Sequence, residues 1–313
     1  MHPSAGCLTV SPDSQHLERD AVMVCENRYI RFCKAVRMVV KTSNLPKYTS
    51  KYSPKKYTVP QKITLLALKE YESYRHFKDW LRISDKIVDL LDLPEIPHFT
   101  TLNKFMNRVN TDVVQTIIGL FSNDEMVDLA IDSTGMRLNH GSYYYTKRLK
   151  QLGIERTQTS KHLKLSIGIE TDSQFIVSSK LRRGPASDHI DFDLLLKKAS
   201  SWSNLQTVIA DKGYDSESNH KIAREVFNSK SIIPPRNQDV PVHRTNGWYR
   251  KKMKRDFDKE KYNQRNKVET VNSVIKRLMS DSIKSRKVRT QNREMEFKML
   301  AYNAHRKAMN MRS

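Results

Sequence analysis

The order of short apolar runs from residue 126 onward restricts the possible folds of this chain more than any other feature. Three strand-like runs come first, and patterns typical of helices and strands then alternate. A three-strand meander followed by helix-linked strands predicts an α/β fold: a mixed five-stranded sheet with helices on its faces. The predicted strands span residues 126–135, 162–169, 175–181, 205–210 and 231–235. The predicted helices span residues 190–201, 216–228, 262–276 and 293–309.

Two of these strands are expected to run into an aspartate. Asp132 precedes Ser-Thr-Gly, and Asp211 precedes Lys-Gly-Tyr. An aspartate after one strand is usually a turn residue. Here the fourth strand can lie beside the first, and ligands of open sheets gather outside the carboxyl ends of neighbouring strands. The pair of aspartates therefore indicates a site at one edge of the sheet.

The segment 262–276 has the pattern of an amphipathic helix. At about 100° per residue, Tyr262, Arg265, Glu269 and Lys276 fall within roughly 60° of one another. The opposite face is apolar, with Val268, Val271, Ile275 and Leu278. Taken alone, this pattern also describes a surface helix whose charges are only solvated. The two strand-end aspartates shift the balance toward a site that includes Glu269.

Together Asp132, Asp211 and Glu269 would form a three-carboxylate site. Carboxylate oxygens suit hard divalent cations such as Mg²⁺. Two such ions about 3.5–4 Å apart can activate an attacking oxygen and stabilise a leaving oxygen of a phosphodiester. On this hypothesis Arg265 and Lys276 contact a DNA backbone, Arg265 in bidentate fashion and Lys276 as a point charge. Tyr262 would hydrogen-bond a phosphate or pack on a sugar.

The net charge of the 313-residue chain points to a polyanionic partner. Lys and Arg number 56 against 34 Asp and Glu, a formal charge of +22. Nucleic acid is the simplest partner, bound through phosphate contacts and counterion release; an anionic membrane or a generally basic surface are the alternatives. No apolar run approaches the ~18 residues of a transmembrane helix, and the first twenty residues do not resemble a secretory signal.

The three cysteines, Cys7, Cys25 and Cys33, contain no CxxC pair. An odd number without such a pair argues against a disulfide framework or a zinc site. A reducing cytoplasmic compartment fits this usage best.

The N-terminal third divides at about residue 58. Residues 1–57 are interpreted as a basic, loosely organised arm, although 27–41 suits a basic helix. Residues 58–123 are interpreted as a helical DNA-binding domain. Its third helix, from about Thr100, resembles the recognition helix of a helix-turn-helix, while a simple helix bundle is the alternative.

Several further residues are weaker candidates for DNA contact. Lys212, beside the second aspartate, is a candidate phosphate ligand. Trp248 lies among cations that include Arg250 and could stack on an unpaired base; an ordinary buried Trp is the alternative. Helix capping is expected for the remaining acidic residues of this region, which are Asp188, Asp191, Asp193 and Asp215.

The spacing Tyr262-x2-Arg265-x3-Glu269-x6-Lys276 resembles the signature of prokaryotic insertion-sequence transposases of the DDE type. Asp132-Ser-Thr-Gly and Ala210-Asp211-Lys-Gly-Tyr-Asp215 resemble the two aspartate motifs of the same enzymes. The segment Arg183-Gly-Pro-Ala-Ser-Asp188-His189 also resembles the stretch before their second aspartate. The best match is the insertion sequence five family, over about residues 58–309.

This resemblance implies an RNase H-like catalytic domain over residues 124–313. It also implies two Mg²⁺ ions, replaceable by Mn²⁺, on Asp132, Asp211 and Glu269. The implied activity is cleavage at terminal inverted repeats and strand transfer into target DNA, by a homodimer on double-stranded DNA in the nucleoid. Two alternatives stay open: an RNase H-like nuclease without strand transfer, and a non-catalytic DNA-binding regulator derived from a transposase.

Overall fold

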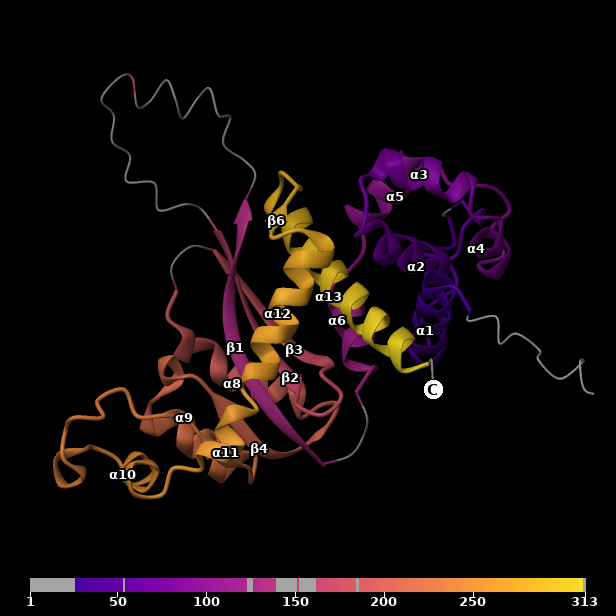
Figure 1. Cartoon of the computed structure of the whole chain (residues 1–313). Coiled ribbons are helices and arrows are strands. Elements are labelled where there is room, and N and C mark those ends of the chain that lie inside the picture. The colour runs from indigo at the N-terminus through magenta and orange to yellow at the C-terminus, as the bar shows by residue number, and fades with distance from the viewer. Residues whose placement is uncertain are drawn as a thin grey trace, which may run out of the picture.

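The computed structural model describes residues 26–52, 54–122, 126–138, 151, 162–183 and 186–311. Figure 1 shows a twisted sheet with helices on its faces and, beside it, a group of N-terminal helices. The strands of the sheet are β1 (Met126–Leu138), β2 (His162–Glu170), β3 (Ile176–Arg183), β4 (Asn204–Ala210), β5 (Lys230–Ile232) and β6 (Ser282–Ile283).

The sheet is mixed, in the order β3-β2-β1-β4-β5. The first three strands form the antiparallel meander that the sequence predicts. β4 pairs with β1 in parallel, and β5 pairs with β4 in parallel; helical segments precede both strands. The sixth strand, β6, pairs with Arg137 and Leu138 at the far end of β1. The expectation of five strands is therefore wrong by one, because a two-residue strand is too short to leave a periodic pattern.

Both faces of the sheet are buried. Ala130 and Met136 of β1 face a core shared with α12 (Asn266–Met279) and α13 (Val288–Asn310). Leu129 and Ile131, one position out of phase, face a second core. That second core is covered by α8 (Phe192–Ala199) and by the segment after β4, which contains the short 3₁₀ turn η3 (Lys212–Tyr214), α9 (Glu217–Lys221) and a π-helical turn, η4 (Ile222–Val226). Because side chains alternate along β1, each residue's position in the strand decides which of the two faces of the sheet it reaches.

The helical part comprises α1 (Arg28–Thr42), α2 (Val59–Lys69), α3 (Tyr74–Arg82), α4 (Asp85–Leu90), α5 (Phe99–Met106) and α6 (Thr111–Gly119). The C-terminal helix α13 packs against α1, α2, α5 and α6 (Figure 1). An ordered α1 lies within the segment for which the sequence suggests a loose arm. Its Phe32, Val36 and Val40 are buried in the core, and that burial stabilises a helix whose overall composition is basic.

The helix expected over residues 262–276 is broken. Tyr262 lies on α11 (Lys259–Asn263), and α12 starts at Asn266. Between them, the amides of Gln264 and Arg265 donate to carbonyls three residues back, which forms a tight turn. The apolar face is as predicted from Val268 onward: Val268, Val271 and Ile275 are buried. The amphipathic pattern persists across the break and gives no sign of it.

Candidate active site

Strand pairing brings Asp132 and Asp211 together. The parallel register of β1 and β4 ends at the pair Ile131 and Ala210, so the two aspartates are the next residues on neighbouring strands. Asp211 directly follows β4, as predicted. Asp132 does not end its strand, because β2 continues to pair with β1 beyond it, opposite Ile167. Asp132 therefore sits in the strand interior, at the point where its neighbour on the other side stops.

Glu269 reaches the same region from the first turn of α12. Its side chain is 52% exposed, and its Oε1 accepts a hydrogen bond from Arg265 Nη2 at 2.6 Å. Arg265 Nη1 lies 4.0 Å from Asp132 Oδ2. The guanidinium also lies over the ring of Tyr262, 5.8 Å from its centroid. The turn between α11 and α12 thus places one cation between two of the three carboxylates.

The electrostatics of this group reflect crowding of negative charge. Burial raises the pKa of Asp132, and the charges of Asp211 and Glu269 raise it further, against the opposing effects of the Ser133 amide and Arg265. Burial also raises the pKa of Tyr262, and the charges of Asp211 and Glu269 raise it further. Close carboxylates of this kind need a compensating cation or a proton. Arg265 supplies only part of that compensation.

A cleft of about 580 Å³ opens between β1 and α12. It is lined by Asp132, Thr134, Glu269, Asn272, Ser273, Lys276, Arg277 and Asp281. Lys276 Nζ donates to Thr134 Oγ1 at 2.5 Å across the cleft. Lys276 and Glu269 therefore face the same open space, as their helical spacing predicts. The combination of an acidic end and a basic end suits a substrate that carries phosphates along its length.

Asp188 is a further acidic residue at this site, and the capping role expected for it is wrong. Its Oδ1 accepts hydrogen bonds from Ser133 Oγ and Lys164 Nζ, both at 2.6 Å. Its Oδ2 would lie only 2.9 Å from a Cβ added at Gly213. Burial alone would raise the pKa of Asp188, but its hydrogen bonds and nearby cations lower it overall. Asp188 thus bridges the residues that follow Asp132 and Asp211.

Asp191 and Asp193 also make ion pairs instead of capping bonds. Asp191 is buried and pairs with Arg182 Nε at 2.5 Å, and Asp193 pairs with Lys197 one helical turn later. α8 has no side-chain capping bond at its N-terminus. The spacing of Asp193 and Lys197 can be read from the sequence, whereas the partner of Asp191 lies on β3 and is not revealed by local pattern.

Asp215 is the centre of a separate ion pair. Its carboxylate accepts hydrogen bonds from Arg250 Nη2 at 2.6 Å, Arg250 Nε at 2.9 Å and the Arg236 amide at 2.9 Å. The next helix is capped by Ser216 instead. Burial would raise the pKa of Asp215, but His220, Arg250 and the Arg236 amide outweigh it and lower that pKa strongly.

Of the remaining candidates for DNA contact, Arg250 is paired within the protein, whereas Lys212 and Trp248 are exposed. Arg250 is committed to Asp215, so its guanidinium faces the protein interior. Lys212 is exposed beside Asp211. Trp248 is 65% exposed at the start of α10 (Trp248–Arg255), which excludes the buried alternative. Lys252 lies 5.6 Å from the Trp248 ring centroid. An exposed indole next to cations is available for stacking.

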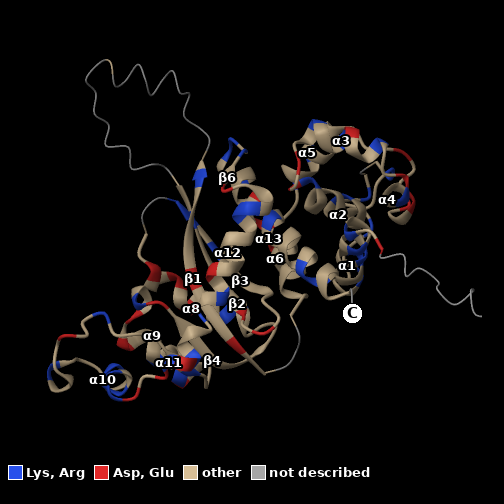
Figure 2. Cartoon of the chain, in the orientation of Figure 1, with Lys and Arg blue, Asp and Glu red and all other residues tan. Residues whose placement is uncertain are grey.

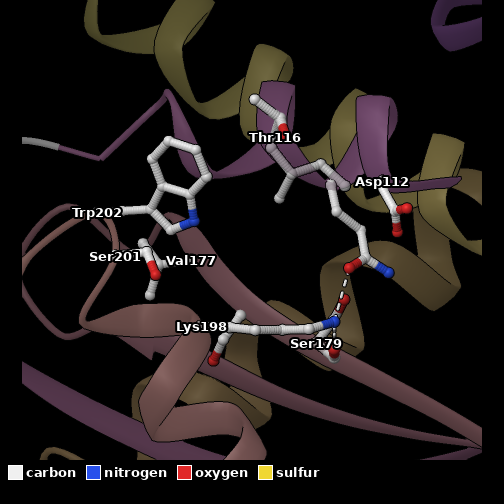
Figure 3. Close-up of a pocket in the computed structure, with 10 residues that line it drawn as sticks. Asp112, Thr116, Val177, Ser179, Lys198, Ser201 and Trp202 are labelled. Atoms are coloured by element: carbon white, nitrogen blue, oxygen red, sulfur yellow. Dashed lines mark hydrogen bonds between the residues drawn. The ribbon is translucent and has the colours of Figure 1, made fainter.

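A second hollow lies away from the carboxylates, between α6, α8 and β3 (Figure 3). Its volume is about 190 Å³. Lys198 Nζ donates to Gln115 Oε1 at 2.6 Å and to the Ser179 carbonyl at 3.0 Å. Gln115 in turn donates to Glu296 of α13 at 2.9 Å. This polar chain joins the sheet to the helical part, and none of its residues lines the cleft beside Asp132.

The carboxylate donors suit a divalent cation in kind. Asp132, Asp211 and Glu269 offer only oxygen ligands. The pKa of Asp132 is raised by burial first, and by the charges of Asp211 and Glu269 in addition. As the side chains stand, the described residues contain no group of three His, Cys, Asp or Glu arranged to hold a metal ion. Glu269 is instead paired with Arg265 one turn away, whose side chain is 17% exposed against 52% for Glu269. Pairs at this spacing on a helix are of modest strength.

Comparison with protein families settles what kind of domain carries this site. Residues 124–304, more than half of the chain, match the family model described as "Transposase DDE domain". The chain belongs to this DDE transposase family. The matched region starts just before β1 and ends within α13, so it includes all six strands of the sheet and the three carboxylates.

One solved structure similar to this DDE transposase domain protein is a cryo-EM structure of the piggyBac transposase synaptic complex with hairpin DNA. The two chains share 11% sequence identity, with a TM-score of 0.45, over 91% of this chain and 73% of that one. The comparison with curated proteins found no match. None of the helices in the described part of the chain has the length and hydropathy to span a bilayer.

Proposed function

We propose that this chain is a DNA transposase that cuts DNA at terminal inverted repeats and transfers the freed ends into target DNA. The observation that carries the proposal is that Asp132 and Asp211 are neighbours on two parallel strands, while Glu269, from a following helix, lines the same cleft as Asp132. Membership of the DDE family supports an enzyme that acts on phosphodiester bonds. The signature spacing supports the insertion sequence five family and a prokaryotic source, and the order β3-β2-β1-β4-β5 supports an RNase H-like sheet.

In this proposal Asp132, Asp211 and Glu269 hold two divalent ions, Mg²⁺ or its substitute Mn²⁺. When bound, such ions activate an attacking oxygen and stabilise the leaving oxygen of the phosphodiester. Arg265 fixes the carboxylate of Glu269 and offsets negative charge beside Asp132. Lys276, at the other end of the cleft, binds a phosphate of the strand that lies along α12. Tyr262 orients Arg265 through its ring.

DNA binding beyond the cleft is assigned to two regions. The helical part, residues 58–123, would recognise the repeats, with the exposed Asn103, Lys104 and Arg108 of the α5 region facing solvent. Lys212 and Trp248 would contact the DNA end near Asp211. Transposition joins two ends, so we expect two copies of the chain to assemble on paired repeats.

The test is a cleavage assay on labelled duplex that carries the repeats flanking the gene, with Mg²⁺ and with EDTA. We expect Mg²⁺-dependent cuts at the repeat boundary and joined products when target DNA is added. Asp132→Asn, Asp211→Asn and Glu269→Gln should each reduce cleavage by more than the 10–100-fold typical of supporting residues around a metal site, roughly a thousandfold. DNA binding in EDTA should survive in all three.

Glu260→Gln is the matched control, because Glu260 is an exposed glutamate on α11, outside the residues that line the cleft. It should cleave like the wild type. Full activity in any of the three carboxylate variants would refute the site assignment. Cut products that are never joined would favour the nuclease alternative, and repeat-specific binding without cutting would favour the regulator.

A further inference from the structure

The connection between β6 and α13 carries an exposed basic run that the motifs do not include. This 284–289 segment reads Lys284-Ser-Arg-Lys-Val-Arg289. Its four cations are exposed, and Val288 is 61% exposed. Within the described residues, none of the four is within ion-pair distance of a carboxylate, although 18 such pairs occur in the described chain. The segment therefore holds four exposed positive charges that form no ion pair within the described residues.

The backbone of the 284–289 segment is held by buried side chains of α13. Glu294 accepts hydrogen bonds from the amides of Lys284 at 2.9 Å and Ser285 at 2.8 Å. Gln291 donates to the carbonyls of Ser285 at 3.0 Å and Arg286 at 3.2 Å. Both side chains are 3% exposed. A loop that is fixed in this way loses little conformational entropy when its cations meet a ligand.

The same helix, α13, also holds the residues that lead into the 284–289 segment. Lys298, which is 1% exposed, donates to the carbonyls of Ser280 at 3.0 Å and Ser282 at 2.8 Å. These residues directly follow α12, so the end of the Glu269 helix and the basic segment are anchored to one support. The position of the cations relative to the cleft is therefore set by buried contacts.

The segment lies between the cleft and the helical part. On one side, β6 pairs with the end of β1, next to the cleft residues Arg277 and Asp281. On the other side, Arg293 Nη1 donates to the carbonyl of Met106 at the end of α5, at 3.1 Å. Figure 2 shows the blue of these cations at the loop beside β6. A ligand that reached from the cleft to α5 would pass over them.

We propose that the 284–289 segment binds the phosphate backbone of duplex DNA between the cleft and α5. This rests on the proposed function, which supplies the DNA. Glu269 and the end of α12 are separated by ten residues, or about 15 Å along a helix axis. At 3.4 Å per base pair, the end of α12 lies about four to five base pairs from the cut, and the segment follows it after β6. The segment thus sets the path of the duplex on the side that leads to the helical part.

The experiment measures DNA affinity against salt concentration by fluorescence anisotropy, in EDTA, with a labelled duplex. The segment variant is Arg286→Ala, Lys287→Ala and Arg289→Ala combined. The control variant, Lys41→Ala, Lys47→Ala and Lys221→Ala combined, removes the same charge from exposed positions on α1, on the connection that follows it and on α9, all outside residues 58–123. Each lost phosphate contact lowers the slope of log affinity against log salt by about 0.9 for B-DNA. We expect a decrease of about 2 to 3 for the segment variant and less than about 1 for the control.

A third variant, Arg286→Lys with Arg289→Lys, keeps the charge and should keep the wild-type slope. Equal slopes for the segment and control variants would overturn the proposal, provided that circular dichroism shows all of them folded, as their exposure predicts. Because binding is measured without metal, its outcome is independent of cleavage. Wild-type cleavage of repeat ends with equal slopes would reject only the segment, and a reduced slope without any cleavage would reject only the transposase.

Discussion

Asp132, which is half-buried on β1, and Asp215, which is buried after β4, have opposite electrostatic situations. Asp215 is enclosed by Arg250 and the Arg236 amide, and its pKa is strongly lowered. Burial raises the pKa of Asp132, the charges of Asp211 and Glu269 raise it further, and Arg265, at 4.0 Å, opposes them only in part. A structural carboxylate is satisfied by its own chain, whereas a ligand-binding one is left under-compensated. On the proposed function, this difference distinguishes Asp132 from Asp215 more clearly than sequence spacing does.

The largest expected effect on this comparison comes from Arg250→Ala, which leaves Asp215 buried without its main partner. Breaking a buried pair in this way typically costs about 3–5 kcal/mol. Urea denaturation at neutral pH would measure the loss, with Arg255→Ala on the exposed side of the same helix as the control. Because the lowered pKa of Asp215 stabilises the fold only while the group is ionised, the difference from wild type should shrink as the pH falls into the acid range.

The same variant tests the role that the sequence suggests for Arg250. A phosphate ligand would lose DNA affinity on substitution with little change in the free energy of unfolding. Unchanged stability together with weaker DNA binding would contradict the structural role and return Arg250 to the DNA interface.

Glu296 sharpens the comparison between the two aspartates, because it also has a raised pKa although it does not line the cleft. Burial raises the pKa of Glu296 to about 7, against hydrogen bonding by Gln115 and the charges of Lys198 and Arg293. Its contribution to stability is fully present below the pKa of the unfolded chain, about 4.5, and is lost as the pH rises toward 7. Glu296→Gln should remove this dependence, which amounts to at most about 1.4 kcal/mol per pH unit.

Thermal unfolding of the full chain between pH 5 and 8 would measure this pH dependence of stability. The variant and the wild type should have curves that diverge between pH 5 and 7 and run parallel above. Parallel curves throughout would show that Glu296 does not titrate in this range. Diverging curves would show that a carboxylate outside the cleft has a raised pKa, so that a raised pKa alone does not identify a catalytic carboxylate.

The smallest expected effect is a gain in stability on Asp132→Asn. This change removes one negative charge next to Asp211 and Glu269, so in EDTA at neutral pH it should stabilise the fold by up to about 1 kcal/mol. Calorimetry would measure the change in melting temperature. Asp281→Asn is the control, since Asp281 also lines the cleft but is paired with Arg137 at 2.7 Å. A loss of stability in Asp132→Asn equal to that of the control would mean that Asp132 is already compensated.

Local patterns in the sequence predicted most of the strands to within one or two residues. Alternation and apolar runs are properties of neighbouring residues, so β2, β3 and β4 were readable without knowledge of their partners. The place of Asp132 inside its strand was not readable, because it depends on how far β2 continues to pair with β1. The turn at Arg265 was also hidden, since an apolar stripe continues across it.

By itself, the sequence determined the identity of the carboxylates, their order along the chain and the excess of positive charge. The tertiary structure alone decided which charges compensate one another. Arg250 and Asp215 are 35 residues apart, Asp188 and Ser133 are 55 apart, and Glu294 holds a loop that precedes its own helix. Such pairings depend on distances created by the packed sheet and helices, because Coulomb and hydrogen-bond energies depend on separation and burial.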